Sequence, residues 1–256
     1  MNKNGAVECV TGLPWSGVRY FCSTRAGGFS APPWDGLNLG LHVGDEPQAV
    51  QRNRALLGGG LPADPLWLDQ VHGIEVCDAD AWTDGGTPRA DAAVTTRRDR
   101  PLAILTADCL PVVLADAGGC VLGVAHAGWR GLAAGVLENT LARMRPKAPR
   151  DSRWRAWIGP AIGQASFEVG PEVREAFAGA DPALATFFVG RPGSDRWLAD
   201  LAAIARHRLR AAGVEQIECS GHCTYQDTRR FYSYRRDART GRQATIAWLA
   251  AGACDA

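Results

Sequence analysis

The sequence carries almost no net charge and no long apolar run. Lys and Arg total 28 against 27 for Asp and Glu, which gives a formal charge of +1. A surface without a basic excess does not attract nucleic acid or an anionic membrane, so neither is an expected partner. No apolar stretch reaches the roughly 18 residues of a membrane span, and a secretory signal pattern is missing. We therefore expect a cytoplasmic protein.

Eight cysteines in 256 residues do not by themselves indicate a disulfide scaffold, because such scaffolds belong to short secreted chains. Most of the thiols are expected to be reduced. A buried cysteine behaves as a small hydrophobic residue, and three lie in or beside apolar runs where a core position is expected: Cys22, Cys77 and Cys120. Three others remain as candidates for a function: Cys109, Cys219 and Cys223.

Short apolar segments bounded by turn residues alternate with segments of helical periodicity. The pattern predicts strands over 18–23, 66–69, 74–77, 102–106, 112–116 and 121–125, and helices over 47–57, 131–144, 171–177 and 197–212. Since some strands follow one another directly and others are separated by helices, a mixed α+β sheet is favoured. No repeat is visible, and the one linker-like stretch, 145–150, is short. We expect a single domain over 1–256, with its core at about 18–250.

Three metal-capable side chains follow apolar strands in the same way. His72 ends the segment that starts at Leu66, Cys109 follows 102–106, and His126 follows 121–125. If these strands share a sheet, their ends bring two imidazoles and a thiolate together. Three protein ligands and an open position are typical of catalytic zinc. The alternative is that each histidine is a satisfied core or turn residue and Cys109 an inert thiol.

Two glycine-containing segments carry an arginine that could bind an anion. Arg130 stands where the segment after His126 opens into a predicted helix, whose free N–H groups and dipole favour phosphate or carboxylate. Arg25 lies in the glycine-rich loop 23–30, which lacks the P-loop lysine. Asn38 and His42, from a second glycine-bounded segment, are further pocket candidates. In the alternative interpretation, the glycines only permit turns and Arg130 is solvated or ion-paired.

A second group of metal-capable residues is closer together in the chain: Cys219, His222 and Cys223. It lacks a further cluster that would complete a closed tetrahedral site, and Cys219 continues a strand-like run from Val214. A structural role is favoured there. His207 alternates with arginines and is expected on a solvated helix face.

Several longer motifs resemble, in order, those of the YfiH or laccase-domain family. The resemblance runs from about residue 20 to 249, and its most specific motifs are 69–73 (Asp-Gln-Val-His-Gly) and 125–131 (Ala-His-Ala-Gly-Trp-Arg-Gly). The other matching segments are 23–28, 38–45, 90–92, 106–111, 158–160 and 231–237.

This resemblance implies an α/β/β/α layered sandwich and a purine nucleoside phosphorylase, which we expect to be a monomer. Such an enzyme cleaves adenosine, inosine, guanosine and methylthioadenosine with phosphate to the free base and a pentose 1-phosphate, and it also deaminates adenosine. The family's zinc ligands correspond to His72, Cys109 and His126. Phosphate would then bind at Arg130 and Arg25, and Asp108 or Asp91 would carry the proton in deamination.

Three other functions stay open. A Cys109/His126 nucleophile pair would suit a hydrolase that edits a serine-containing muropeptide precursor, another activity ascribed to the family. A multicopper oxidase needs more than the five histidines present, and a single copper site would lack an axial methionine unless Met1 or Met144 supplied it. A zinc-stabilised binding protein ranks last, because a 256-residue core needs no such support.

Overall fold

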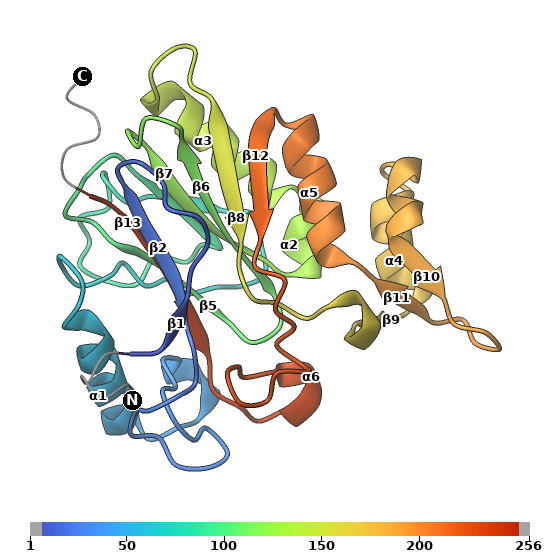
Figure 1. Cartoon of the computed structure of the whole chain (residues 1–256), viewed down its shortest axis with the longest axis horizontal. Helices are drawn as coiled ribbons and strands as arrows, with labels where there is room; N and C mark the ends of the chain where they lie inside the picture. The colour runs from blue at the N-terminus through green and yellow to red at the C-terminus, as the bar shows by residue number, and fades with distance from the viewer. Residues whose placement is uncertain (1–6, 251–256) are drawn as a thin grey trace.

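The computed structural model describes residues 7–250, which build two principal β-sheets (Figure 1). The larger sheet has the strand order β12 (Val214–Cys219), β8 (Trp154–Ile158), β6 (Leu110–Asp116), β7 (Leu122–Ala127), β4 (Ala92–Thr95) and β3 (Val76–Asp78). The smaller has the order β1 (Cys9–Val10), β2 (Val18–Ser23), β13 (Gln243–Leu249) and β5 (Leu102–Thr106). Parallel pairs, β12 with β8 and β3 with β4, stand beside antiparallel ones, so the sheet is mixed.

Helices cover the outer faces of both sheets: α2 (Trp129–Ala134), α3 (Val136–Met144) and α5 (Leu201–Ala211) lie on the larger sheet, and α1 (Pro47–Gly58) lies on the smaller one. Two further helices are α4 (Pro171–Ala178) and the short α6 (Tyr234–Asp237). A third, small sheet of β10 (Phe188–Gly190), β11 (Trp197–Ala199) and β9 (Glu168–Val169) lies with α4 at one end of the molecule (Figure 1).

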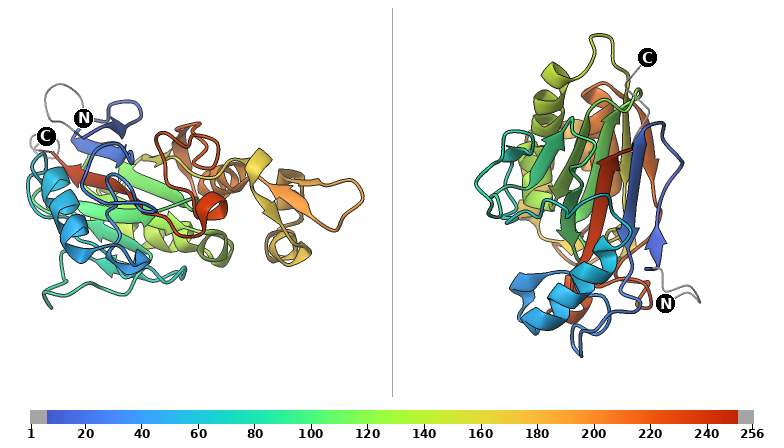
Figure 2. Two further views of the ribbon diagram at one scale, coloured as in Figure 1. Left: turned by 90° about the horizontal axis from the view of Figure 1, so that it is seen from below. Right: turned by 90° about the vertical axis from the view of Figure 1, so that its left-hand side faces the viewer.

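Three apolar clusters define the layers. One lies between the larger sheet and α2 to α5, and includes Leu137 of α3 and Leu114 of β6. The second fills the space between the sheets, where Ile104 of β5 joins Val113 of β6. The third packs the outer face of the smaller sheet against Leu57 of α1. The two sheets therefore stack face to face between helices (Figure 2), which confirms the expected α/β/β/α sandwich.

Two predicted strands, 18–23 and 102–106, are confirmed with the same bounds, as is the helix at 47–57 apart from its last residue. Two predicted helices are wrong in part. The segment 131–144 is broken at Gly135, whose φ of 102° suits glycine and ends α2 before α3 begins. The segment 197–212 begins as strand β11, and α5 starts only after Asp200, whose carboxylate caps it by accepting from the N–H of Ala203.

The segment 66–69 is not a strand but makes isolated bridges, Leu66 with Leu102 and Asp69 with Arg89. Cys22 and Cys77 are buried free thiols, as expected. Cys120 is half-buried and disulfide-bonded, so the expectation of a core thiol is wrong there. Among residues 7–250, no helix is both long and apolar enough to cross a membrane.

Candidate metal centre and its pocket

His72, Cys109 and His126 come together in the structure. The nearest ligand atoms of the three side chains all lie within 4.8 Å of one another, and Cys109 Sγ is 3.9 Å from His72 Nε2. The two imidazoles meet edge to face, with 4.7 Å between ring centroids. His126 is buried, Cys109 half-buried and His72 exposed, so the group faces solvent on one side. Within residues 7–250, it is the one group of three or more side chains placed to hold a metal.

The premise that the three preceding strands share a sheet is wrong. His126 lies in β7 of the larger sheet, whereas β5, which precedes Cys109, belongs to the smaller one. Cys109 stands where the chain passes from β5 to β6, and therefore from one sheet to the other. His72 lies in a loop ahead of β3. The site forms where two sheets are joined, and strand ends within one sheet do not account for it.

Asp91 links two of the candidate ligands. Its Oδ1 lies 2.8 Å from Nδ1 of His126 and accepts from the N–H of His72 at 2.9 Å. Its Oδ2 accepts from the N–H groups of Val71 and Gly73 at 3.1 and 2.7 Å. The backbone carbonyl of Asp91 also accepts from the N–H of His126. One fully buried carboxylate thus sets both the orientation of His126 and the course of the loop that carries His72.

Two residues with unusual backbone conformation and two glycines make room for the cluster. His72 and Asp108, which precedes Cys109, both have positive φ, 60° and 99°, in a region that non-glycine residues rarely adopt. At Gly128, a Cβ would lie 2.9 Å from Cδ2 of His72 and 3.0 Å from Sγ of Cys109. At Gly131, it would lie 2.7 Å from the carbonyl oxygen of Gly73. The glycines after His126 therefore let the ligand segments approach one another.

The electrostatics favour an ionised thiol. Burial raises the pKa of the Cys109 thiol, but the positive charge of His126 and hydrogen bonds from both histidines outweigh it, so the net pKa is lowered. For His126, burial lowers the pKa, and the negative charge of Cys109 together with Asp91 outweighs it and raises the pKa. The protein without metal thus favours a thiolate next to an imidazolium.

These residues fit a zinc ion. Imidazole and thiolate are the donors zinc prefers, and ligand atoms within 4.8 Å of one another can surround an ion at bond lengths of about 2.0–2.3 Å. Nδ1 of His126 is engaged by Asp91, which leaves Nε2 to bind metal. A carboxylate behind a ligating histidine is the usual outer support of such sites.

The cluster opens into a cavity of about 390 Å³. Besides the three candidate ligands, it is lined by His42, Gln70, Leu105, Thr106, Ala107, Tyr234 and Arg242. Gln70 is fixed by two 2.8 Å hydrogen bonds with the backbone of Leu105. Burial, with Arg242 and Arg54 nearby, lowers the pKa of His42, which favours its neutral form. Of the four binding residues predicted from sequence, His42 is in this pocket.

The other three binding candidates are engaged elsewhere. Arg25 pairs with Asp35 at 2.9 Å and stacks on Tyr232. Asn38 is buried, and its amide nitrogen donates to Asp45. Arg130 is exposed, lies over Trp129, and does not line the cavity.

The carboxylate of Asp108, the predicted proton carrier, is engaged in three hydrogen bonds away from the cavity. Asp108 accepts from the hydroxyls of Thr224 and Ser233 at 2.7 and 3.0 Å and from the N–H of Arg235 at 2.7 Å. It does not line the cavity. These contacts tie the turn that carries Cys109 to the C-terminal part of the chain.

Arg242 is the pocket cation that the sequence analysis missed. Its Nη1 donates to the carbonyl oxygens of Thr240 and Gly241, which holds the guanidinium in place. It lies 133 positions after Cys109 in the sequence, and no local pattern connects the two. Tyr234, which lines the cavity beside Arg242, lies in the family motif 231–237, and that motif was the one sequence signal near this wall.

In the second group of metal-capable residues, His222 and Cys223 make contacts within the protein that are typical of a structural role. Nδ1 of His222 lies 3.2 Å from the guanidinium of Arg230, and Sγ of Cys223 accepts from the N–H of Gly163. His207 lies 3.2 Å from Asp181. None of these side chains belongs to a group able to hold a metal in the described part of the chain.

The fold and the site together define a layered α/β/β/α protein in which a His₂Cys cluster opens into a cavity. A family model described as multi-copper polyphenol oxidoreductase laccase matches residues 19–250. This chain belongs to that family, which includes proteins named YfiH.

Named relatives and solved structures are similar to this chain over nine-tenths of its length or more. Purine nucleoside phosphorylase PA4543 of Pseudomonas aeruginosa is 48% identical over 232 residues, covering 91% of this chain and 93% of its own. Purine nucleoside phosphorylase YfiH of Escherichia coli is 46% identical over 235 residues, covering 91% and 94%. The structure of Neisseria meningitidis protein NMB0706 is similar with a TM-score of 0.87, 44% identity and coverage of 95% and 99%. Bacillus licheniformis YfiH has a TM-score of 0.82 and 31% identity, with coverage of 91% and 92%.

Proposed function

We propose that this protein is a zinc-dependent purine nucleoside phosphorylase that acts on adenosine, inosine, guanosine and methylthioadenosine, and that the same site deaminates adenosine. The observation that carries the proposal is one cavity shared by the His72, Cys109 and His126 cluster and the guanidinium of Arg242. The names of relatives 46–48% identical over nine-tenths of the chain support the phosphorylase activity.

The pocket suits a nucleoside together with an anion. Its volume of about 390 Å³ lies in the range of about 300–1,000 Å³ usual for small-molecule sites. Arg242 presents a fixed guanidinium fork, the group best suited to phosphate. We assign phosphate to Arg242 in preference to Arg130 or Arg25, because only Arg242 of the three lines the cavity.

In phosphorolysis, a phosphate oxygen attacks C1′ of the ribose, the C1′–N9 bond breaks, and the purine leaves with the bonding electrons and takes up a proton. Arg242 holds the phosphate and offsets its charge against the developing transition state. Zinc, when bound, supplies a Lewis acid that polarises a reactant oxygen and acidifies water. Asp91 keeps the imidazole of His126 oriented throughout.

Deamination replaces the amino group at C6 of adenine by a water oxygen and releases ammonia. The carboxylates first considered as proton carriers, Asp91 and Asp108, make four and three hydrogen bonds respectively. Their geometry supports positioning roles. His42 faces the cavity, and its lowered pKa leaves its imidazole free to accept a proton near neutral pH.

A second candidate function rests on the lowered pKa of Cys109. A thiolate beside His126, which is in turn oriented by Asp91, has the elements of a nucleophilic amide hydrolase. The substrate would then be a serine-containing muropeptide precursor. This reaction would proceed without metal and would be insensitive to chelator.

The test is product analysis on protein of measured zinc and copper content. Adenosine is incubated with and without phosphate, and adenine, ribose 1-phosphate and inosine are separated. We expect adenine and ribose 1-phosphate only with phosphate, inosine in both cases, and loss of all three in His72→Ala. The matched control is His207→Ala, outside the pocket, which should behave as wild type. Absence of all products from wild type, or full activity of His72→Ala, would overturn the proposal. In a parallel incubation with the serine-containing muropeptide precursor, chelator-resistant release of serine would favour the hydrolase.

A further inference from the structure

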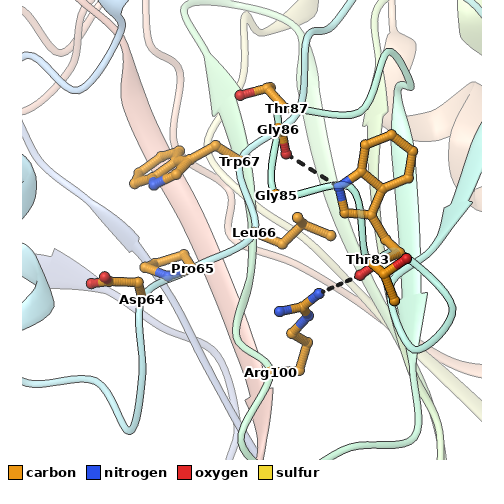
Figure 3. Close-up of a pocket in the computed structure, with 10 residues that line it drawn as sticks. Asp64, Pro65, Leu66, Trp67, Thr83, Gly85, Gly86, Thr87 and Arg100 are labelled. Atoms are coloured by element: carbon orange, nitrogen blue, oxygen red, sulfur yellow. Dashed lines mark hydrogen bonds between the residues drawn. The ribbon is translucent and has the colours of Figure 1, made fainter.

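A second cavity, of about 440 Å³, lies apart from the metal pocket and shares no lining residue with it. Its walls come from residues 64–67, the loop 82–87 and Arg100 (Figure 3). The first wall is held to the body of the protein by the bridge between Leu66 and Leu102. Nothing in the proposed reaction uses this cavity.

Arg100 gives the cavity an unsatisfied cationic donor. Its Nη2 donates to the carbonyl oxygen of Trp82 at 3.1 Å, which fixes the guanidinium. Its Nε–H is buried and has no acceptor among residues 7–250, and Arg100 forms no ion pair within that range. Figure 3 shows the guanidinium between the 64–67 segment and the loop at Thr83. The buried Nε–H is out of reach of a ligand, but Nη1 makes no hydrogen bond in the described part of the chain, so the oxygen of a bound anion can accept from it.

Two tryptophans supply flat apolar walls. Trp67 is half-buried, and Arg54 stacks over its ring at 3.9 Å from the centroid, which stiffens the side chain. Trp82 is also half-buried, and its Nε1–H donates to the carbonyl oxygen of Gly86 at 3.2 Å. Both indoles line the cavity and are fixed by these contacts. Rigid indoles favour a ligand with a planar ring, because stacking on such a surface is tolerant of ring identity.

We propose that this cavity binds a small planar aromatic anion, a class that includes purine nucleoside monophosphates and aromatic carboxylates. The ring stacks on the indole of Trp82, because Arg54 already covers one face of Trp67, and the phosphate or carboxylate accepts from Arg100. Asp64 stands at the same cavity and adds negative charge, which disfavours a polyphosphate. A volume of about 440 Å³ suits a ligand of this size.

The test is calorimetric titration of the Cys109→Ser protein, in which the metal pocket is impaired. Adenosine monophosphate and 4-hydroxybenzoate distinguish the two sources of anion, with adenosine, inorganic phosphate and adenosine triphosphate as comparisons. We expect saturable binding of at least one of the first two, with adenosine, phosphate and the triphosphate each about tenfold weaker or more. Arg100→Gln should weaken the binding about tenfold or more.

A second variant blocks the cavity without touching the core. A Cβ at Gly86 meets nothing within 4 Å, so Gly86→Phe places a ring at the cavity with little strain. Gly60 is equally open and lies outside the cavity, which makes Gly60→Phe the matched control. Binding should be lost in Gly86→Phe and kept in Gly60→Phe.

Three results would overturn the proposal: no saturable binding of either ligand at millimolar concentration, binding unaffected by Gly86→Phe, or binding present in wild type and absent from Cys109→Ser. The last would move the ligand to the metal pocket. Since turnover is not measured, these results are independent of whether the protein is a phosphorylase.

Discussion

The carboxylate of Asp91 is bonded to the imidazole of His126, with 2.8 Å between Oδ1 and Nδ1, and at the same time accepts from three consecutive N–H groups of the loop that carries His72. One side chain therefore determines the relative position of two candidate ligands on separate parts of the chain. The contact also favours the proton of neutral His126 on Nδ1, which leaves Nε2 for a metal.

Replacing Asp91 with asparagine should loosen the metal. The neutral amide of Asp91→Asn accepts fewer hydrogen bonds than the carboxylate and none with its negative charge, so we expect zinc affinity to fall about 10–100-fold. The zinc content that remains after dialysis against increasing concentrations of chelator measures this affinity. At saturating zinc, the phosphorolysis activity of the variant should recover in part. Asp195→Asn, at an exposed position, is the control. Wild-type zinc retention in the Asp91 variant would show that the contact does not support the metal.

A methyl group at position 128 should disturb the centre from within. The backbone of Gly128 has φ −61° and ψ 159°, which alanine adopts freely, but its Cβ would press on His72 and Cys109 at 2.9 and 3.0 Å. We expect phosphorolysis to fall about 100-fold in Gly128→Ala, since small displacements of reacting groups are costly. The midpoint of thermal unfolding should stay close to that of wild type while kcat/KM falls. Gly60→Ala is the control, and equal kcat/KM in the two variants would contradict the crowding argument.

The arginine that binds phosphate can be identified by kinetics. Arg242 lines the cavity, whereas Arg130 is exposed over Trp129. Arg242→Gln should raise the KM for phosphate about tenfold or more, because a charge-assisted bond is lost. Arg242→Lys should recover part of the effect, and Arg130→Gln should resemble wild type. A larger rise in the KM for phosphate in Arg130→Gln than in Arg242→Gln would instead assign phosphate binding to Arg130 at the start of α2.

Asp80 should make the stability depend on pH in the acid range. Burial raises the pKa of its carboxyl, but hydrogen bonds from Thr95 and Thr96 and the charge of Lys147 outweigh it and lower the pKa. A carboxyl whose pKa is lower in the folded state contributes stability above its unfolded pKa of about 3.9, and loses it as pH falls through the folded value.

Asp80→Asn should therefore lower the free energy of unfolding at pH 7 by about 1 kcal/mol or more. The difference from wild type should shrink as the pH falls below about 4. Urea unfolding at several pH values measures this, with exposed Asp84→Asn as the control. A difference that persists unchanged at low pH would mean that the ionised carboxylate is not the cause.

Local pattern was sufficient for much of the fold. The strands 18–23 and 102–106 are apolar runs bounded by turn residues, and both occur as predicted. Predictions were wrong where one residue changes the local course of the chain, as at Gly135 and Asp200. β13 was not predicted, although this seven-residue strand lies between β2 and β5 and pairs with each of them through five residues. This strand lies near the C-terminal end of the chain after a turn-rich segment, and its position in the sheet depends on partner strands that are distant in sequence.

Residue type and local pattern were enough to single out the side chains that can bind a metal, because two imidazoles and a thiolate follow apolar segments of the chain. The tertiary structure decided how they meet: across the connection between two sheets, oriented by Asp91 and sharing a cavity with Arg242. It also separated Arg25 and Arg130 from that cavity. The physical reason is that residue type sets what a group can bind, whereas distances between groups far apart in the chain are set by how the sheets pack.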